Sequence, residues 1–310
     1  MRWLLRFPVP HPIPYQGSKR RLAKAILSHI EAGRYTRLIE PFAGSGAVTL
    51  AAAQHRKFAR FVLGDKLEPL ATLWQSIIQD PGPIADEYEV LWRREHDNPI
   101  GEYYTIRTEF NRDRNPAKLL YLLARCVKNA VRFNPAGDFN QSPDKRRSGT
   151  RPDSMRKELT SAHDLLNRKA EAVCADFFDL FQASQPGDFF YLDPPYQGTS
   201  EGRDSRYIGG VTRERIIEGL AILNDRGNPF ILSYDGACGD RTYGDRLPPE
   251  LSSRVLLDVG RSSQATLNGE DYVTIESLYI SHSLAPAGAD NVVMTLHDFE
   301  PETAFTGFLF

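Results

Sequence analysis

The sequence has little of what a disulfide framework or a zinc site requires. Its three cysteines, Cys126, Cys174 and Cys238, lie far apart without CxxC spacing, and its seven histidines show no HxxxH pairing. Such spacings are the usual signs of structural disulfides and zinc ligands. We therefore expect free thiols and no bound metal.

Long hydrophobic runs and an excess of one charge are missing too. The chain has no run of about eighteen apolar residues, the length that spans a bilayer. Its apolar N-terminus is interrupted by Arg6 and by prolines, which is unlike a signal peptide. We expect a cytoplasmic protein without membrane contact. The 38 basic residues are balanced by 40 acidic ones, so only a local cluster could indicate a polyanionic partner.

What the sequence does contain is the rhythm of a parallel α/β fold. "RLIE", from Arg37, is a short strand pattern that ends in a glycine-rich turn, and an alanine-rich helix pattern starts near Ala47. A second strand pattern ends at Asp65 and leads into another helix pattern. Strand, turn and helix in this order predict βαβ units. We therefore predict a mainly parallel sheet with helices, formed by residues 1–80 and 166–285.

Residues 81–165 differ in character. They are charged and helix-compatible at first and then rich in turns, without the alternation of strands. We predict an inserted domain of helices and loops. Residues 286–310 contain prolines and end in "FTGFLF", and we expect an irregular C-terminal tail.

The glycine turn "EPFAGSGAV" contains Phe42, Gly44 and Gly46 in an FxGxG pattern. Glycines allow a tight turn and a close approach to a ligand, and the helix start supplies free N–H groups. Thr49 stands where a dinucleotide fingerprint needs its third glycine, and no GK[ST] of a P-loop follows. Asp65 ends the next strand, where it can accept hydrogen bonds from ribose hydroxyls or cap a helix. Together these residues suggest an adenosine-containing cofactor.

A second motif, "DFFYLDPPY", ends a strongly apolar strand pattern in Asp193, Pro194, Pro195 and Tyr196. A buried parallel strand places Asp193 at the sheet edge where α/β proteins bind ligands. The prolines end the sheet ladder because they lack N–H groups. Asp193 and a neighbouring carbonyl would accept both hydrogens of an exocyclic amine, and the Tyr196 ring would stack on a planar base.

In this order the motifs resemble the Dam-like adenine-N6 DNA methyltransferases of the alpha group and DPPY type. "PYQGSKRRL" stands where the family has its N-terminal lysine motif, although Ser18 separates the glycine from Lys19. "YYTIRTEFN" and "NAVRFNPAGDFNQSP" are similar to two further family segments, with Ala130 in place of the usual glycine. The resemblance implies a Rossmann-like methyltransferase domain that uses S-adenosylmethionine, and an insertion that recognises DNA.

The resemblance also implies which residues bind the cofactor. They are contributed by the lysine motif, the glycine turn, the second strand and the "CADF" segment, and they are Tyr15, Lys19, Glu40, Pro41, Phe42, Ala43, Gly44, Gly46, Asp65, Asp176 and Phe177.

DNA contacts are expected in the insertion, from a run of basic residues in a loop between Gln141 and Lys157. Such a run suits phosphate contact, although alone it would also fit a solvated surface. Side chains that can read base edges precede it. The predicted DNA-binding residues are Arg132, Asn134, Asn140, Gln141, Lys145, Arg146, Arg147 and Arg151, with Arg156 and Lys157 completing the basic run.

These residues predict methyl transfer to the N6 atom of an adenine flipped out of duplex DNA, in restriction–modification or epigenetic marking. Asp193 and the Pro194 carbonyl would accept the N6 hydrogens, and a positively charged methyl donor needs no metal. Cytosine-N4 methylation and a non-catalytic DNA-binding module of the same fold remain as alternatives. A cognate restriction endonuclease is a possible partner.

Overall fold

The computed structural model describes residues 8–94, 98–195, 211–238, 241–243, 245–261, 273–285 and 292–295. Within them, nine strands form one sheet in the order β3-β2-β1-β4-β5-β8-β7-β9, with β6 attached to β5. The strands are β1 (Arg37–Glu40), β2 (Arg60–Asp65), β3 (Ala170–Cys174), β4 (Asp188–Leu192), β5 (Phe230–Cys238), β6 (Arg241–Tyr243), β7 (Ser253–Arg261), β8 (Val273–Ile280) and β9 (Val292–Thr295).

The strands that come first in the sheet order are parallel. β1 pairs with β2 and β4, β2 pairs with β3, and β4 pairs with β5, all in parallel. β8 runs antiparallel to both β5 and β7. The order of the strands reverses between β1 and β4, and ligands of open α/β sheets bind at such a switch point. The predicted Rossmann-like fold with a mainly parallel sheet is confirmed.

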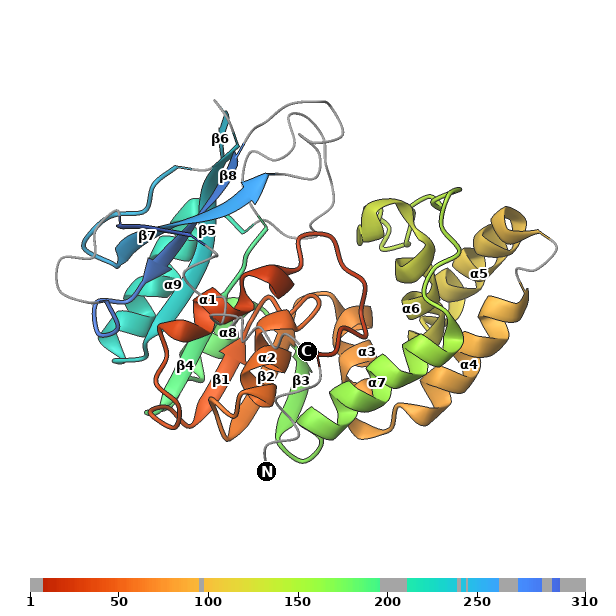
Figure 1. Cartoon of the computed structure of the whole chain (residues 1–310), viewed down its shortest axis with the longest axis horizontal. Coiled ribbons are helices and arrows are strands. Elements are labelled where there is room, and N and C mark those ends of the chain that lie inside the picture. The colour runs from red at the N-terminus through yellow and green to blue at the C-terminus, as the bar shows by residue number, and fades with distance from the viewer. Residues whose placement is uncertain are drawn as a thin grey trace, which may run out of the picture.

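Helices cover both faces of the sheet (Figure 1). One face packs on α1 (Ala23–Ser28), α2 (Ala47–Gln54) and α3 (Glu68–Gln79), and the other on α8 (Phe177–Gln182) and α9 (Arg213–Asp225). Neighbouring residues of a strand divide between the two layers: Leu38 joins the first core and Ile39 the second. This follows from the alternation of side chains along a strand.

The central strand β4 is buried on both faces. Phe189, Phe190, Tyr191 and Leu192 are each at most 1% exposed, and burying such a side chain contributes about 1.5–3 kcal/mol. Asp188, at the start of the strand, is also buried, and Arg37 donates to both of its carboxylate oxygens at 2.8 and 2.7 Å. The apolar run therefore fixes the strand that carries Asp193 to the sheet edge.

Four further helices gather at the β3 end of the sheet (Figure 1). They are α4 (Gly82–Arg94), α5 (Pro99–Asp113), α6 (Pro116–Arg125) and α7 (Pro152–Leu166). Asn98 and Asn115 accept hydrogen bonds from the first-turn N–H groups of α5 and α6, and a proline follows each of them. The segment between α6 and α7 contains the short 3-10 helix η3 (Val127–Asn129) and a bridge that pairs Phe133 with Phe139.

Two segments differ from the sequence expectations. Arg156 and Lys157 lie on α7, because Pro152 starts that helix at the end of the basic loop. Val292–Thr295 forms β9, parallel to β7, inside the segment expected to be an irregular tail. Its "VVMT" sequence suits a strand, but four residues among prolines and glycines are too short a pattern to be found by alternation.

Candidate active site

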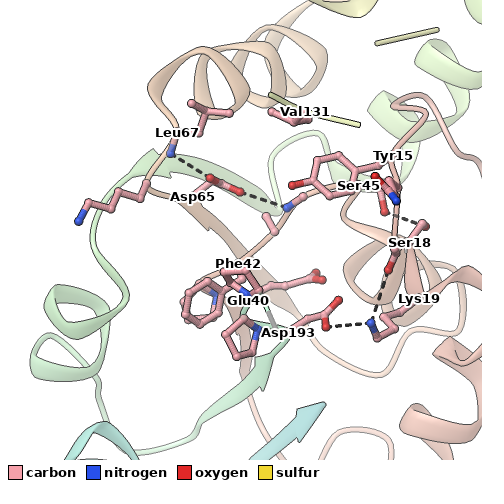
Figure 2. A pocket seen from close by; sticks show the side chains of 18 of the residues that line it. Tyr15, Ser18, Lys19, Glu40, Phe42, Ser45, Asp65, Leu67, Val131 and Asp193 are labelled. Carbon is pink, nitrogen blue, oxygen red and sulfur yellow. Dashed lines mark hydrogen bonds and ion pairs between the residues drawn. The ribbon is translucent and has the colours of Figure 1, made fainter. Parts of the chain in front are cut away.

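Four carboxylates meet at one edge of the sheet. Glu40 and Asp65 are the last residues of β1 and β2, Asp193 follows β4 directly, and Asp176 follows β3 after one further residue. Because these strands are parallel, their carboxyl ends lie on the same side of the molecule. Figure 2 shows Glu40, Asp65 and Asp193 pointing into the space between these strand ends and the N-terminal segment. A sequence that spreads these residues over 150 positions is thus folded into one acidic site.

The residues enclose a cavity of about 240 Å³. It is lined by Tyr15, Lys19, Glu40, Pro41, Phe42, Ala43, Gly44, Asp65, Asp176, Phe177, Asp193, Pro194 and Pro195 among the predicted residues. Gly46 lies behind this surface, and Tyr196 lies outside the described residues. The lining also includes Gln16, Gly17, Ser18, Ser45, Ala47, Lys66, Leu67, Ala130, Val131, Phe133 and Val211, which the motifs did not single out as site residues.

The glycine turn has a backbone that side chains would not tolerate. Gly44 and Gly46 have φ angles of +47° and +59°, in the left-handed region where glycine is favoured. A Cβ atom at Gly46 would lie 2.7 Å from the ring of Trp74, and one at Gly44 would lie 3.1 Å from the ring of Tyr15. Trp74 also donates from its indole nitrogen to the Gly44 carbonyl at 2.9 Å. The turn is therefore fixed from behind by Trp74, and Tyr15 lies on its cavity side.

Asp65 joins this turn to α3. Its carboxylate accepts hydrogen bonds from the Gly44 N–H at 3.3 Å and from the Leu67 N–H at 2.9 Å (Figure 2). Burial raises its pKa to about 6, although the two N–H groups act in the opposite direction. Asp65 does not cap α3, because the N-cap of this helix is Leu67 and no side chain makes a capping hydrogen bond there. Each oxygen retains acceptor capacity toward the cavity.

Glu40 holds the end of β1 against the start of α2. Its carboxyl Oε2 accepts from the backbone N–H and the hydroxyl of Thr49 at 3.1 and 2.6 Å. The residue is 3% exposed, and burial raises its pKa to about 8, against the effect of these hydrogen bonds. The negative charges of Asp193 and Asp65 raise it further. Thr49, which broke the dinucleotide fingerprint, is therefore a structural partner of Glu40.

Asp176 and Phe177 line the cavity, and an arginine that the motifs missed contacts both of them. Asp176 accepts from the Phe178 N–H at 3.1 Å, from Lys66 at 3.2 Å and from Arg215 at 2.9 Å. The Arg215 guanidinium lies 4.8 Å from the centre of the Phe177 ring, within range of a cation–π interaction. Partial burial raises the pKa of Asp176, but these three donors together hold it below its usual value. Nothing in the sequence around Arg215 indicates this contact.

Asp193 is paired with Lys19. The Lys19 Nζ atom lies 2.9 Å from Asp193 Oδ1 and 3.8 Å from Glu276 Oε2 (Figure 2 shows the first pair). Burial raises the pKa of Asp193, and the positive charge and hydrogen bond of Lys19 lower it. The lysine motif was expected to contact the cofactor; in this structure it also supplies the counter-ion of the DPPY carboxylate.

The arrangement combines a glycine turn at a helix start, carboxylates at successive strand ends and a DPP segment on a buried strand. A family model for D12 class N6 adenine-specific DNA methyltransferases matches residues 15–256, which include all of these elements. The chain belongs to this family.

Individual members of this methyltransferase family are similar over most of the chain. The Retron Ec67 DNA adenine methylase of Escherichia coli is 28% identical over 227 residues, which cover 71% of this chain and 75% of that protein. The DNA N-6-adenine-methyltransferase of Escherichia phage P1 is 25% identical, over 72% of this chain and 29% of that protein. The type II methyltransferase M.MjaIII of Methanocaldococcus jannaschii is 24% identical, over 60% of this chain and 68% of that protein.

The methyltransferase therefore acts on adenine in DNA, and it requires a methyl donor and DNA as partners. This assignment favours adenine over the cytosine-N4 alternative, and an enzyme over a binding module. Among the described residues, no group of three or more His, Cys, Asp or Glu side chains could hold a metal ion. In the same part of the chain, no helix is long and apolar enough to cross a bilayer.

The residues predicted to contact DNA lie in the segment between α6 and α7 of the methyltransferase. Lys145, Arg146, Arg147 and Arg151 are all exposed. Arg146 and Arg147 both pair with Asp144, at 3.6 and 3.3 Å, and Arg147 also lies 3.4 Å from the side-chain oxygen of Asn129. Arg156 is paired with Asp86 at 2.7 Å. The basic run is therefore divided into side chains that project from the loop and side chains held by the protein.

The predicted base-reading residues are likewise of two kinds. Arg132 is exposed. Asn134 accepts from the Asp138 N–H at 2.8 Å, which closes the turn between Phe133 and Phe139, and Gln141 accepts from the Ser142 N–H at 3.0 Å. Asn140 lies next to this turn, and its buried side-chain oxygen accepts no hydrogen bond from a described residue. The side chain of Asn134 thus shapes the loop, whereas Arg132 projects from it.

Proposed function

We propose that this methyltransferase uses S-adenosylmethionine as methyl donor and binds it in the cavity between the glycine turn, Asp65 and Asp193. The observation that carries the proposal is that these three elements line one cavity, although they come from different ends of the catalytic domain. A methyl group can be transferred directly only if donor and acceptor lie within contact distance. A single cavity that is lined by the proposed donor-binding residues and by the proposed acceptor-binding residue Asp193 meets this condition.

The residues fit an adenosine-containing donor. Asp65 offers acceptor oxygens at the end of β2, as ribose-binding carboxylates do. Phe42 and Phe177, whose ring centres are 5.3 Å apart, offer an apolar surface for a planar base, and Asp176 lies beside it to accept from an amino group. The donor would supply an activated methyl group on a sulfonium, and the protein would supply position and charge.

Asp193 and Pro194 would hold the acceptor. The lone pair of adenine N6 is delocalised into the ring, so N6 is a poor nucleophile. Hydrogen bonds from its two hydrogens to the Asp193 carboxylate and the Pro194 carbonyl favour a pyramidal nitrogen whose lone pair is directed at the methyl group. The base must first be flipped out of the duplex. Tyr196 remains our candidate for stacking on it.

The helices and loops of residues 81–165 are proposed as the target-recognition domain. Lys145, Arg146, Arg147 and Arg151 would contact phosphates, and Arg132, with Asn140 and Gln141, would approach base edges. Type II methyltransferases and DNA adenine methylases both occur among the relatives. The chain would therefore serve in restriction–modification, with a cognate endonuclease, or in epigenetic marking.

The test is a product analysis. Purified protein is incubated with S-adenosylmethionine carrying a tritiated methyl group and with duplex DNA of mixed sequence, and the DNA is digested to nucleosides. We expect the label in N6-methyldeoxyadenosine. Label in N4-methyldeoxycytidine, or none despite measurable donor binding, would contradict the proposal.

A further inference from the structure

Glu276 is a second carboxylate beside Lys19 that the proposed mechanism does not use. It lies on β8, and its Oε2 atom is 3.8 Å from the Lys19 Nζ atom. This oxygen is shielded from solvent and makes no hydrogen bond with any described residue. The side chain is only 23% exposed. A buried carboxylate oxygen without a donor is costly unless it has a function or an intermittent partner.

The sheet is built to bring Glu276 toward the cavity. Glu276 pairs with Gly236 of β5, at the point where the register of β5 and β8 shifts. A Cβ atom at Gly236 would lie 2.6 Å from the Ile275 carbonyl oxygen, so only glycine allows β8 to approach this closely. β5 and β8 lie side by side in Figure 1, and β5 is also the neighbour of β4, the strand that Asp193 follows. The position of Glu276 near Lys19 therefore has its own structural cause.

Lys19 in its observed position holds one oxygen of the carboxylate that the proposed mechanism needs. Its ammonium group already donates to Asp193 at 2.9 Å, and the proposed mechanism requires the same carboxylate to accept a hydrogen from adenine N6. A lysine that stays on Asp193 would weaken that second bond, because it draws the negative charge of the carboxylate to itself. A second anion within reach allows Lys19 to release Asp193 without becoming an unpaired buried cation.

We propose that Glu276 is the alternate counter-ion of Lys19: when the adenine amino group binds Asp193, Lys19 moves toward Glu276. Glu276 thus acts through Lys19 and is a positioning residue. The inference rests on the proposed function, since it assumes that Asp193 accepts from N6. No covalent step is added to the reaction.

The charges around Glu276 agree with this role. Burial raises its pKa and so does the negative charge of Asp193, whereas Lys19 lowers it. The ion pair of Arg254 with Asp235, at 3.1 Å, belongs to the opposite face of the sheet, where it meets Tyr279. Lys19 and Asp193 are thus the charged groups that act on Glu276 within the described chain. Two carboxylates thus share one cation.

The test compares Glu276→Gln with the wild-type protein in single-turnover methyl transfer across the pH range. We expect the plateau rate to fall by about 10- to 100-fold, because Lys19 stays on Asp193. In the plot of rate against pH, the rate should fall on the acid side because Asp193 becomes protonated. This acid limb should move to lower pH by about half a unit or more in the variant, since removal of a neighbouring negative charge lowers the pKa of Asp193. Donor affinity should change less than about threefold. Glu171→Gln, an exposed carboxylate on β3, is the matched control.

A slower rate with an unmoved acid limb would reduce Glu276 to a structural role and overturn the inference, as would an unchanged rate. Glu276→Asp keeps the charge with a shorter reach, so it should restore the acid limb and part of the rate. This variant decides the question if the glutamine variant does not fold. A wild-type protein that transfers no methyl group from S-adenosylmethionine would instead refute the proposed function.

Discussion

The Lys19 ammonium lies 2.9 Å from the Asp193 carboxylate and connects the lysine motif directly to the DPPY motif. Asp193 directly follows the buried strand β4, and burial raises its pKa. Lys19 opposes this shift and favours the charged form that can accept a hydrogen bond. The N-terminal segment is thus part of the reaction site.

The glycine turn should be intolerant of side chains at Gly46. Gly46→Ala would place a methyl group 2.7 Å from Trp74 at a positive φ, and we expect a loss of about 2–4 kcal/mol in the free energy of unfolding. Gly33→Ala is the control, because it also has a positive φ but no atom within 4 Å of the added Cβ. It should cost about 1 kcal/mol. Urea unfolding of both variants measures the difference, and equal losses would show that Trp74 does not constrain the turn.

Glu40 should make stability depend on pH. Its pKa of about 8 in the folded protein exceeds the ordinary glutamate value of 4.5, so between these values the folded state retains a proton that the unfolded state releases. The stabilisation is complete below about pH 4.5 and is lost as the pH rises toward 8. Glu40→Gln removes this titration. When the pH is raised from about 5 to about 8.5, the free energy of unfolding of the variant, measured in urea, should therefore increase relative to that of the wild-type protein. A difference that does not change with pH would mean that Glu40 ionises normally.

The exposed basic residues of the loop and Arg156, which residues of α4 hold, should differ in DNA binding. Lys145→Ala, Arg146→Ala and Arg151→Ala should each weaken binding and reduce the slope of log affinity against log salt by about 1. Arg156→Ala should leave that slope unchanged, because Asp86 and Glu89 already hold this guanidinium. Fluorescence anisotropy over a salt series gives the slopes. Equal slopes for all four variants would place the phosphate contacts elsewhere.

Arg215 should support donor binding. It is 2.9 Å from Asp176 and lies over Phe177, so Arg215→Ala should weaken S-adenosylmethionine binding by about 5- to 20-fold. Arg226→Ala, at the other end of α9, removes a hydrogen bond to Ser184 and serves as control. Isothermal titration calorimetry measures both affinities. If Arg226→Ala weakens binding as much as Arg215→Ala does, the effect comes from α9 as a whole.

Much of the site could be predicted because its residues end strands. Apolar runs that stop at Glu40, Asp65 and Asp193 indicate parallel strands, and parallel strands bring their carboxyl ends to one edge. The family segments in residues 81–165 could likewise be recognised by their order. Local patterns of this kind depend on residues that are close in sequence.

The contacts that could not be predicted join residues that are far apart in sequence and lack a motif. Arg215 reaches Asp176 from the first turn of α9, and Glu276 approaches Lys19 because Gly236 lets β8 come close. The partner of a charged side chain depends on how distant elements pack, and the pattern of apolar residues in the sequence does not predict this packing. The division of the basic run between loop and α7 has the same origin, since Asp86 and Glu89 on α4 pair with Arg156.

The central claim, that Asp193 activates adenine N6 in a donor-binding cavity, is tested most directly by the single-turnover rate of Asp193→Asn. The amide keeps the size of the carboxylate but lacks its charge, and its N–H groups would face the N6 hydrogens. We predict that methyl transfer to adenine falls by about two to three orders of magnitude, while S-adenosylmethionine and DNA still bind. Transfer at a rate close to that of the wild-type protein would contradict the account.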